Sequence, residues 1–295
     1  MLLLDYVFYS FTIVVVLQAI YYLFIFSRFT YLEPKKEKEK NIPVSILICA
    51  KNEADNLNTF LPYILKQDYP QFEIVLINDD SSDDTLEIME SFTSKHNHVK
   101  IVNVAPNDAF IANKKYALTL GIKAAKHNFL LFTDADCKPK TKYWLKEMSS
   151  HFSTKKTIVL GYGAYAKISN SFLNKLIRFE TVLTALQYFS FSQLGMPFMG
   201  VGRNLAYRKD EFFNANGFQN HMQIPSGDDD IFINQVATKD NTSICFSKNS
   251  FTISNPKTSF RSWLTQKRRH ITTAKYYQLK HKVLLTLFFI SQFLF

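Results

Sequence analysis

Short apolar runs alternate with stretches of helical spacing through the middle of the chain. Residues 44–49 form an almost continuous apolar run, which is typical of a strand buried on both faces of a parallel sheet. Residues 56–66 carry apolar side chains at helical spacing and end before Pro70. The same rhythm predicts strands at 72–77, 99–104 and 129–132 and helices at 82–95 and 114–125. This alternation predicts an α/β domain with a mostly parallel, Rossmann-like sheet flanked by helices.

Two further apolar segments lie at the ends of the chain. Residues 6–26 carry no charge and are long enough to span a bilayer as a helix. Asp5 precedes this run and no small-residue cleavage site follows it, so we expect a retained anchor rather than a signal peptide. The second segment, residues 283–295, is too short to span. It is interpreted either as an interfacial segment or, preferably, as the start of a membrane segment that continues beyond residue 295.

The basic residues indicate a membrane rather than a nucleic acid as the partner. The net charge is +10, and Lys and Arg cluster at 35–40 and 257–282, each time beside an apolar segment. No zinc finger or recognition-helix pattern is present, so we expect no nucleic-acid partner. The positive-inside rule places the part after residue 26 in the cytosol. The expected organisation is an anchor at 1–30, a charged linker at 31–42, a catalytic domain at 43–280 and the membrane segment at 283–295.

Composition excludes two other classes of protein. A hydrophobic fraction of 47% with 20% charged residues excludes a disordered chain. The three cysteines, Cys49, Cys137 and Cys245, are odd in number and far apart, which argues against a disulfide framework and favours a reducing compartment.

Acidic residues follow three of the predicted strands. They lie in residues 51–53, 78–80 and 134–136, and ligands of open parallel sheets bind at the carboxyl ends of the strands. Asp134 and Asp136 can offer oxygen ligands to Mg²⁺ or Mn²⁺, the cations that prefer carboxylates and substrate phosphates. Neighbouring carboxylates repel each other unless a cation compensates them. The sequence therefore predicts a divalent metal site at Asp134 and Asp136, with a solvated turn as the alternative.

These segments resemble the motifs of the family-2 inverting glycosyltransferases, which have the GT-A fold, over residues 44–280. Residues 44–53 resemble the nucleotide-binding opening of that family, which implies donor-binding roles for Ala50, Asn52 and Glu53. Residues 76–85 resemble its second-strand motif, where Asp79 matches the aspartate that binds the base and hints at uridine. Asn78 and Asp80 depart from the motif, because they replace an aspartate and a glycine.

The resemblance extends to the lysine and metal motifs. Residues 113–118 match the lysine-containing helix start of the family, which implies that Lys114 lies near the nucleotide. By the same resemblance, Asp134 and Asp136 form the metal motif, and Asp134 also contacts the donor.

A run of aspartates resembles the motif that supplies the catalytic base. An inverting transfer needs a carboxylate to take the proton of the acceptor hydroxyl, and residues 226–232 read Ser-Gly-Asp-Asp-Asp-Ile-Phe. Three consecutive aspartates leave the register open; we favour Asp229, with Asp228 next. The alternative is a structural role, because acidic side chains stabilise the N-terminus of a helix.

Residues 266–270 resemble the Gln-x-x-Arg-Trp motif of the family, with His270 in place of tryptophan. The resemblance implies that Arg269 bridges the donor diphosphate through its planar donor fork and that Gln266 positions the acceptor end. Contact with lipid headgroups is the alternative for Arg268 and Arg269. The missing tryptophan weakens the likeness to processive synthases. Residues 172–199 carry apolar side chains at helical spacing, which fits either a core helix or a helix on the membrane surface.

These expectations describe a glycosyltransferase of cell-envelope polysaccharide biosynthesis at the inner (cytoplasmic) membrane. It uses a divalent cation, Mg²⁺ or Mn²⁺, and a nucleoside-diphosphate sugar, with UDP as the expected nucleotide. The acceptor is a hydroxyl of a glycan or of a lipid-linked sugar, and transfer inverts the anomeric centre. The alternatives are a processive polysaccharide synthase, an inactive membrane-surface scaffold and a nucleotidyltransferase. Spacing alone identifies neither the sugar nor the acceptor.

Overall fold

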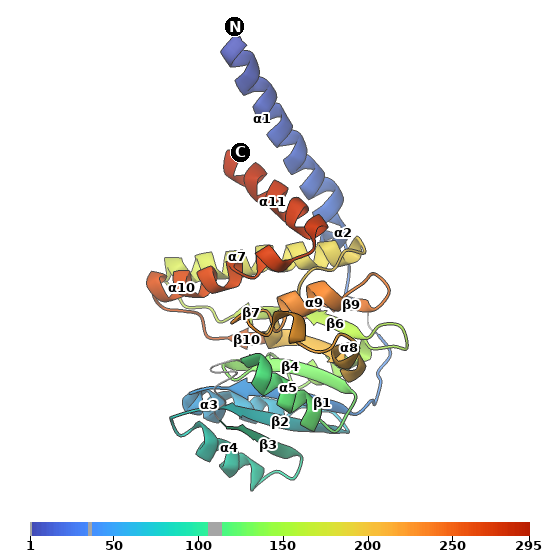
Figure 1. The fold of residues 1–295 in the computed structure, drawn as a ribbon, viewed down its shortest axis with the longest axis vertical. Coiled ribbons are helices and arrows are strands. Elements are labelled where there is room, and N and C mark those ends of the chain that lie inside the picture. The colour runs from blue at the N-terminus through green and yellow to red at the C-terminus, as the bar shows by residue number, and fades with distance from the viewer. Residues whose placement is uncertain (1, 35–36, 106–113) are drawn as a thin grey trace.

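A computed structural model describes residues 2–34, 37–105 and 114–295 of the protein (Figure 1). Lys35 and Lys36 of the expected linker and Asn113 of the lysine motif lie outside the described residues. The remaining parts of segment 31–43 form no helix or strand.

A seven-stranded sheet forms the centre of the domain, in the order β3-β2-β1-β4-β8-β6-β9. Strand β1 pairs in parallel with β2 and β4, β2 with β3, and β6 with β9, whereas β8 runs antiparallel between β4 and β6. The expected mostly parallel α/β sheet is therefore confirmed. The strands are β1 (Val44–Ala50), β2 (Phe72–Asp79), β3 (Val99–Val104), β4 (Phe129–Asp134), β6 (Ile158–Gly161), β8 (Leu205–Arg208) and β9 (Thr242–Cys245).

The two faces of this sheet are covered by different helices. In β1, Ile46 and Ile48 pack in one core cluster with residues of α3 (Ala54–Leu65), whereas Leu47 packs in a second cluster with residues of α5 (Lys114–Ala124). Successive residues of a strand point to opposite faces, so a strand covered on both sides must be apolar throughout. The remaining helices of the domain are α4 (Thr85–Thr93), α6 (Trp144–Ser150), α7 (Phe172–Gln193), α8 (Lys209–Asn214), α9 (Asp230–Val236) and α10 (Phe260–Ile271).

Helix α4 begins three residues later than the sequence predicts. We expected it to open at Ser82, but it starts at Thr85, where the Asp83 carboxylate accepts the first N–H of this helix and also the first N–H of α3. Its Oδ1 accepts the Thr85 N–H at 3.1 Å, and its Oδ2 accepts the N–H of Ala54, the first residue of α3, at 3.3 Å. Asp83 thus ties together the two loops that follow β1 and β2.

A second, three-stranded sheet was not anticipated from the sequence. It has the order β5-β10-β7, with β5 (Cys137–Pro139) following the Asp134–Asp136 turn directly. Strand β10 (Thr252–Ser254) pairs antiparallel with β5 and parallel with β7 (Gly163–Tyr165). This small sheet fixes the turn after β4 against the C-terminal part of the domain.

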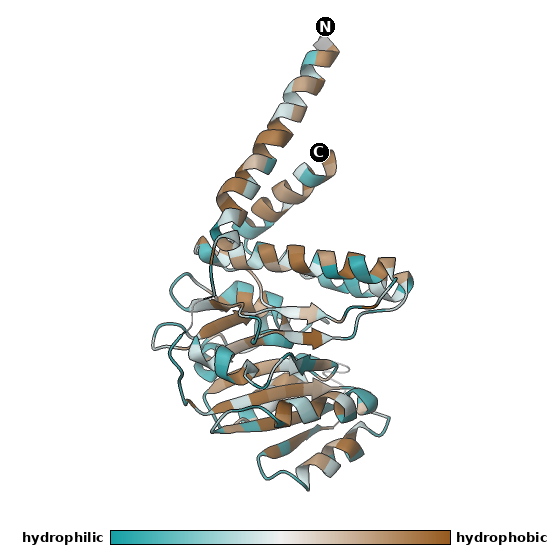
Figure 2. Cartoon of the chain, turned by 180° about the vertical axis from the view of Figure 1, so that it is seen from behind, coloured by the Kyte–Doolittle hydropathy of each residue, from teal (hydrophilic) through white to brown (hydrophobic). Residues whose placement is uncertain are grey.

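Two apolar helices project from one end of the domain (Figures 1 and 2). Helix α1 (Leu2–Ile20) continues through a π-helical turn, η1 (Tyr21–Phe26), into α2 (Ser27–Thr30), and α11 (Leu279–Leu294) packs against α1. The Gln18 side chain donates to the Ser291 hydroxyl at 2.7 Å across this contact. Within the described residues, the stretch Leu3–Thr30 is the one helix that is long and apolar enough to cross a membrane, by length and composition only.

Helices α7 and α10 lie across the domain between the sheets and the two projecting helices (Figure 1). The inner side of α7 is part of the core, because Ile177, Tyr188 and Phe189 are buried. Its outer side leaves Phe172 and Phe179 exposed. Helix α7 is therefore a core helix that also has an exposed apolar face.

Candidate active site

The carboxyl ends of β1, β2 and β4 meet at one edge of the sheet. In the observed register Ala50 lies opposite Asn78, and Cys49 lies opposite Asp134. The predicted donor-side residues Ala50, Asp79 and Asp134 therefore end neighbouring strands, as expected for an open parallel sheet. A small pocket opens there, and the residues that line it include Lys114, Thr133, Asp134, Gly202, Asp228 and Asp229.

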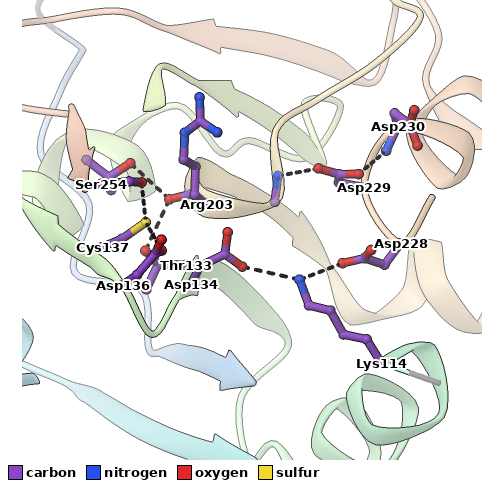
Figure 3. Close-up of polar contacts among 12 residues, drawn as sticks. Lys114, Thr133, Asp134, Asp136, Cys137, Arg203, Asp228, Asp229, Asp230 and Ser254 are labelled. Carbon is purple, nitrogen blue, oxygen red and sulfur yellow. Dashed lines mark hydrogen bonds and ion pairs between the residues drawn. The ribbon is translucent and has the colours of Figure 1, made fainter. Parts of the chain in front are cut away.

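Lys114 links the predicted metal motif to the predicted base motif (Figure 3). Its ammonium nitrogen lies 3.2 Å from Oδ1 of Asp134 and 3.0 Å from Oδ2 of Asp228. Burial disfavours the charged ammonium, but Asp134 and Asp228 outweigh it and raise the pKa of Lys114 well above its ordinary value. The lysine is therefore a fixed positive charge between two carboxylates.

The turn after β4 gathers donor atoms of the kind that hold a cation. Ligand atoms of Asp134, Asp136 and Cys137 lie within 4.8 Å of one another. Burial, followed by repulsion from Asp134, raises the pKa of Asp136 to about 6. Carboxylate oxygens so placed fit Mg²⁺ or Mn²⁺, because a divalent ion would relieve this repulsion.

A tight turn presents the three consecutive aspartates at the start of α9. Gly227 has φ 97°, a conformation that favours glycine, and Asp229 is the N-cap of the helix. The Asp229 Oδ2 accepts the Gly202 N–H at 2.6 Å, and its Oδ1 accepts the Asp230 N–H at 2.7 Å. A Cβ atom at residue 202 would lie 3.3 Å from that Oδ2, so glycine permits this close approach.

The three aspartates have different surroundings. Burial, followed by Asp228 and Asp230, raises the pKa of Asp229 to about 7. Burial opposes ionisation of Asp228 as well, but Lys114 overcomes it and lowers the pKa of that carboxyl. Asp228 and Asp229 line the pocket, whereas the Asp230 carboxylate contacts Thr273 and Tyr277. Of the three, Asp229 is thus the pocket carboxylate whose pKa is raised toward neutral pH.

The loops after β1 and β2 are held in strained backbone conformations. Asn52 has φ 56° and Asp80 has φ 52°, values that Asn and Asp tolerate better than most residues. Asp80 therefore adopts a left-handed conformation at the position where the resembled motif has glycine. The Asn52 Oδ1 accepts the Ser82 N–H at 2.8 Å, which fixes one loop to the other. Glu53 accepts from the Asn56 side chain at 2.6 Å, and burial raises the pKa of Asp79.

Gln266 and Arg269 lie apart from the pocket that contains Lys114. They line a separate groove of about 510 Å³ along α10, together with Lys257, Ser259, Arg261, Ser262 and Thr265. His270 follows Arg269 on α10 and is exposed, and it lies close enough to Asp134 and Arg203 to interact electrostatically with both. Their roles on the diphosphate and the acceptor stay predictions.

Several contacts of the site could not be predicted from the sequence. The Gly202–Asn204 turn (η3) is fixed because the Arg203 carbonyl accepts the hydroxyls of Thr133 at 3.1 Å and Thr252 at 3.0 Å. The Arg203 guanidinium lies over the Tyr165 ring, 4.7 Å from its centroid. The closely spaced glycines at 200 and 202 were a signal for this turn, but no sequence signal pairs Thr273 or Tyr277 with Asp230.

The family comparison matches the part of the chain that builds this site. The sequence profile described as Glycosyl transferase family 2 matches residues 45–213, which is more than half of the 295 residues. The chain is also 35% identical over 122 residues to a poly-beta-1,6-N-acetyl-D-glucosamine synthase of Staphylococcus epidermidis. That match covers 40% of this chain and only 28% of the relative.

Solved structures show the same fold. A mannosyltransferase, PcManGT from Pyrobaculum calidifontis in complex with GDP-Man and Mn²⁺, superposes with a TM-score of 0.65 at 17% identity, over 88% of this chain and 73% of that chain. S. aureus TarS 1-349 in complex with UDP-GlcNAc superposes with a TM-score of 0.53 at 17% identity, over 86% and 73% of the two chains. These likenesses concern the fold, and they confirm the expected GT-A-like architecture.

Proposed function

The chain belongs to glycosyl transferase family 2, and we propose that it transfers a sugar from a nucleoside-diphosphate sugar, with UDP as the nucleotide, to a hydroxyl acceptor with inversion. The acceptor in this proposal is a glycan or a lipid-linked sugar. The observation that carries the proposal is the Asp229 carboxylate, which lies in one pocket with Lys114 and Asp134, where burial raises its pKa to about 7. A base with such a pKa is suited to take a proton at neutral pH.

The proposed reaction is a single displacement. Asp229 takes the proton of the acceptor hydroxyl while the acceptor oxygen bonds to the anomeric carbon from the face opposite the nucleotide. The bond from that carbon to the diphosphate oxygen breaks, and the nucleoside diphosphate leaves with the electron pair. Removal of the proton makes the attacking oxygen a stronger nucleophile, so Asp229 lowers the barrier of the step.

The donor side of the pocket is assigned to the strand-end residues. Asp79 binds the base, and Ala50, Asn52 and Glu53 shape the nucleotide site at the end of β1. Asp134 and Asp136 would hold a Mg²⁺ or Mn²⁺ ion, which when bound neutralises the charge of the diphosphate leaving group. Lys114, which contacts Asp134, would add a positive charge near the same group, while Arg269 and Gln266 are proposed to contact the diphosphate and the acceptor from α10.

The same proposal places the enzyme on a membrane. Residues 1–30 are the anchor, 31–42 the linker, 43–280 the catalytic domain and 283–295 part of a membrane segment, with the domain on the cytosolic side of the inner membrane. The exposed outer side of α7 and α10 supports this placement, because it carries Phe179 and Ile271 next to basic residues such as Arg178 and Arg268. Apolar side chains rimmed by Lys and Arg are suited to an anionic lipid surface.

A processive polysaccharide synthase is the second candidate function. The likeness to the S. epidermidis synthase favours it, but His270 replaces the tryptophan of the resembled motif and Gln266 and Arg269 lie in a separate groove. Product length separates the two candidates. An inactive scaffold is disfavoured, because acidic side chains are retained at the donor, metal and base positions.

A donor screen tests the proposal. The purified full chain in detergent is offered a panel of nucleotide sugars with Mg²⁺ or Mn²⁺, and released nucleoside diphosphate is measured with and without a mixed glycan and lipid acceptor panel. We expect one uridine-linked donor to be consumed, with the product of opposite anomeric configuration by NMR. Retained configuration, or no consumption of any donor by folded protein, would contradict the proposal.

A further inference from the structure

The third aspartate of the acidic run makes contacts of a different kind from its neighbours. Asp230 is only 8% exposed, and its Oδ1 accepts the Ile231 N–H at 2.7 Å. Its Oδ2 accepts hydrogen bonds from the hydroxyls of Thr273 and Tyr277, the latter at 2.8 Å. A buried carboxylate is costly unless such donors satisfy it. Among the described residues its side chain is therefore held by hydroxyl groups and not by an ion pair.

The hydroxyl of Thr273 has two acceptors within reach. Besides Asp230, it lies 2.6 Å from the carbonyl oxygen of His270. A hydroxyl has one proton to donate, and a charged carboxylate is the stronger acceptor. We therefore infer that the Thr273 hydroxyl donates its hydrogen bond to the Asp230 carboxylate.

The contact continues along the same face of α9. Asn234 lies one turn after Asp230, and its Oδ1 accepts the Gln278 N–H at 2.8 Å while its main-chain oxygen accepts the Gln278 side chain at 2.6 Å. Its side-chain nitrogen lies 2.9 Å from Nδ1 of the buried His281. Residues 273–281, which lead into α11, are thus bonded to α9 over two consecutive turns.

Asp229 is positioned by the first turn of this helix. It is the N-cap, and its Oδ1 accepts the N–H of Asp230. Any shift of the Asp230 main chain therefore moves the group that holds the Asp229 carboxylate. The Asp229 Oδ2 is held independently by Gly202, so the Asp230 contact is one of two that fix its orientation.

We propose that Thr273 and Tyr277 are positioning residues that hold Asp229 in place through Asp230, and so connect the base to the segment that enters α11. The proposal rests on the proposed function, in which Asp229 is the general base. It assigns these two residues no contact with substrate. A purely structural contact would stabilise the fold without affecting the rate of proton transfer.

The test compares variants that remove or keep the hydroxyls in the full chain. We expect Tyr277→Phe and Thr273→Val to lower kcat on the order of ten-fold each, with donor affinity unchanged, because only the base is displaced. Thr273→Ser keeps the hydroxyl and restores kcat. Tyr276→Phe is the matched control, because Tyr276 is exposed and adjacent in sequence.

The pH profile separates a change of charge at Asp230 from a change in the position of Asp229. Asp230→Asn removes a negative neighbour of Asp229, so the acid limb of kcat/KM should move to lower pH. Asp230→Asn and Thr273→Val leave the other titratable groups that act on Asp229 unchanged, whereas Tyr277→Phe removes one of them. These groups are Asp228, Lys114, Lys115, Tyr207 and Tyr277.

The outcomes separate this inference from the proposed function. If the wild-type chain consumes no donor, the proposed function fails first. If it is active and Tyr277→Phe and Thr273→Val keep wild-type kcat, the positioning role is wrong. Thermal melting identifies a misfolded variant; if Tyr277→Phe does not fold, the Thr273→Val and Thr273→Ser pair decides by the same criteria.

Discussion

The ammonium group of Lys114 lies 3.0 Å from the Asp228 carboxylate, and this ion pair joins the proposed donor half of the site to the proposed acceptor half. Lys114 is the first residue of α5, beside the strands that end at the nucleotide side, whereas Asp228 precedes α9. Because the same ammonium also contacts Asp134, one positive charge balances a predicted metal ligand and the residue next to the predicted base. The two halves are therefore electrostatically coupled.

Removal of the Lys114 charge should impair both halves. We expect Lys114→Met to lower kcat/KM by roughly 10²-fold, the usual loss when a positioned charged donor is removed from an active site. Steady-state kinetics at varied donor concentration measures the effect. Lys123→Met on the same helix is the matched control, because Lys123 is exposed. Equal activity of the two variants would contradict the role of Lys114.

The metal site predicts a requirement for a divalent cation. Excess chelator should abolish transfer by the wild-type chain, and added Mg²⁺ or Mn²⁺ should restore it. Asp136→Ala should lose the activity and the Mn²⁺ binding heat in calorimetry, because two carboxylates in one turn are needed to hold the ion. Asp240→Asn, an exposed change elsewhere, should leave both intact. Full wild-type activity in excess chelator would rule out the metal.

The raised pKa of the Asp229 carboxyl predicts a trade-off between activity and stability. Burial raises its pKa from an ordinary 3.8 to about 7, so its charged form destabilises the folded state. This destabilisation is absent at low pH and complete above about pH 7. Asp229→Asn should therefore melt at a higher temperature than wild type at pH 8, and the difference should shrink toward pH 4. A difference in Tm that is independent of pH would contradict this origin.

The orientation in the membrane is also testable. In a variant with its native cysteines replaced, a cysteine at the exposed Ser153 should react with an impermeant maleimide only after cells are opened. The reason is the positive-inside rule applied to the basic residues after the first apolar helix. A cysteine added before Met1 should react in intact cells and serves as the control. Labelling of residue 153 in intact cells would overturn the cytosolic assignment.

The sequence predicts the first half of the sheet well, because β1, β2 and β4 are buried on both faces and must be apolar throughout. Ile46 and Leu47, for example, pack into core clusters on opposite faces of the sheet. A strand buried in this way appears in the sequence as a continuous apolar run. The antiparallel insertion of β8 and the β5-β10-β7 sheet could not be predicted, because their short strands pair with partners remote in the chain.

The candidate site shows the same division. Asp134, Asp229 and Lys114 are recognisable because each sits in a local motif, and the pocket brings them together. The Gly202 N–H on Asp229 and the Tyr277 hydroxyl on Asp230 depend on chain folding over long separations, which residue spacing does not encode. The start of α4 differs from the prediction for a related reason, because Asp83 accepts hydrogen bonds from the first residues of both α3 and α4.

The central claim is that Asp229 removes the proton of the acceptor hydroxyl, and single-turnover transfer by Asp229→Asn tests it most directly. At saturating donor the rate should fall by about 10²- to 10⁴-fold, the usual worth of a general base, while donor affinity stays near the wild-type value. Asp228→Asn should chiefly weaken donor binding through Lys114, and Asp230→Asn should reduce the rate less. Wild-type turnover by Asp229→Asn would contradict the account. A larger loss in Asp228→Asn with unchanged donor affinity would move the base to Asp228.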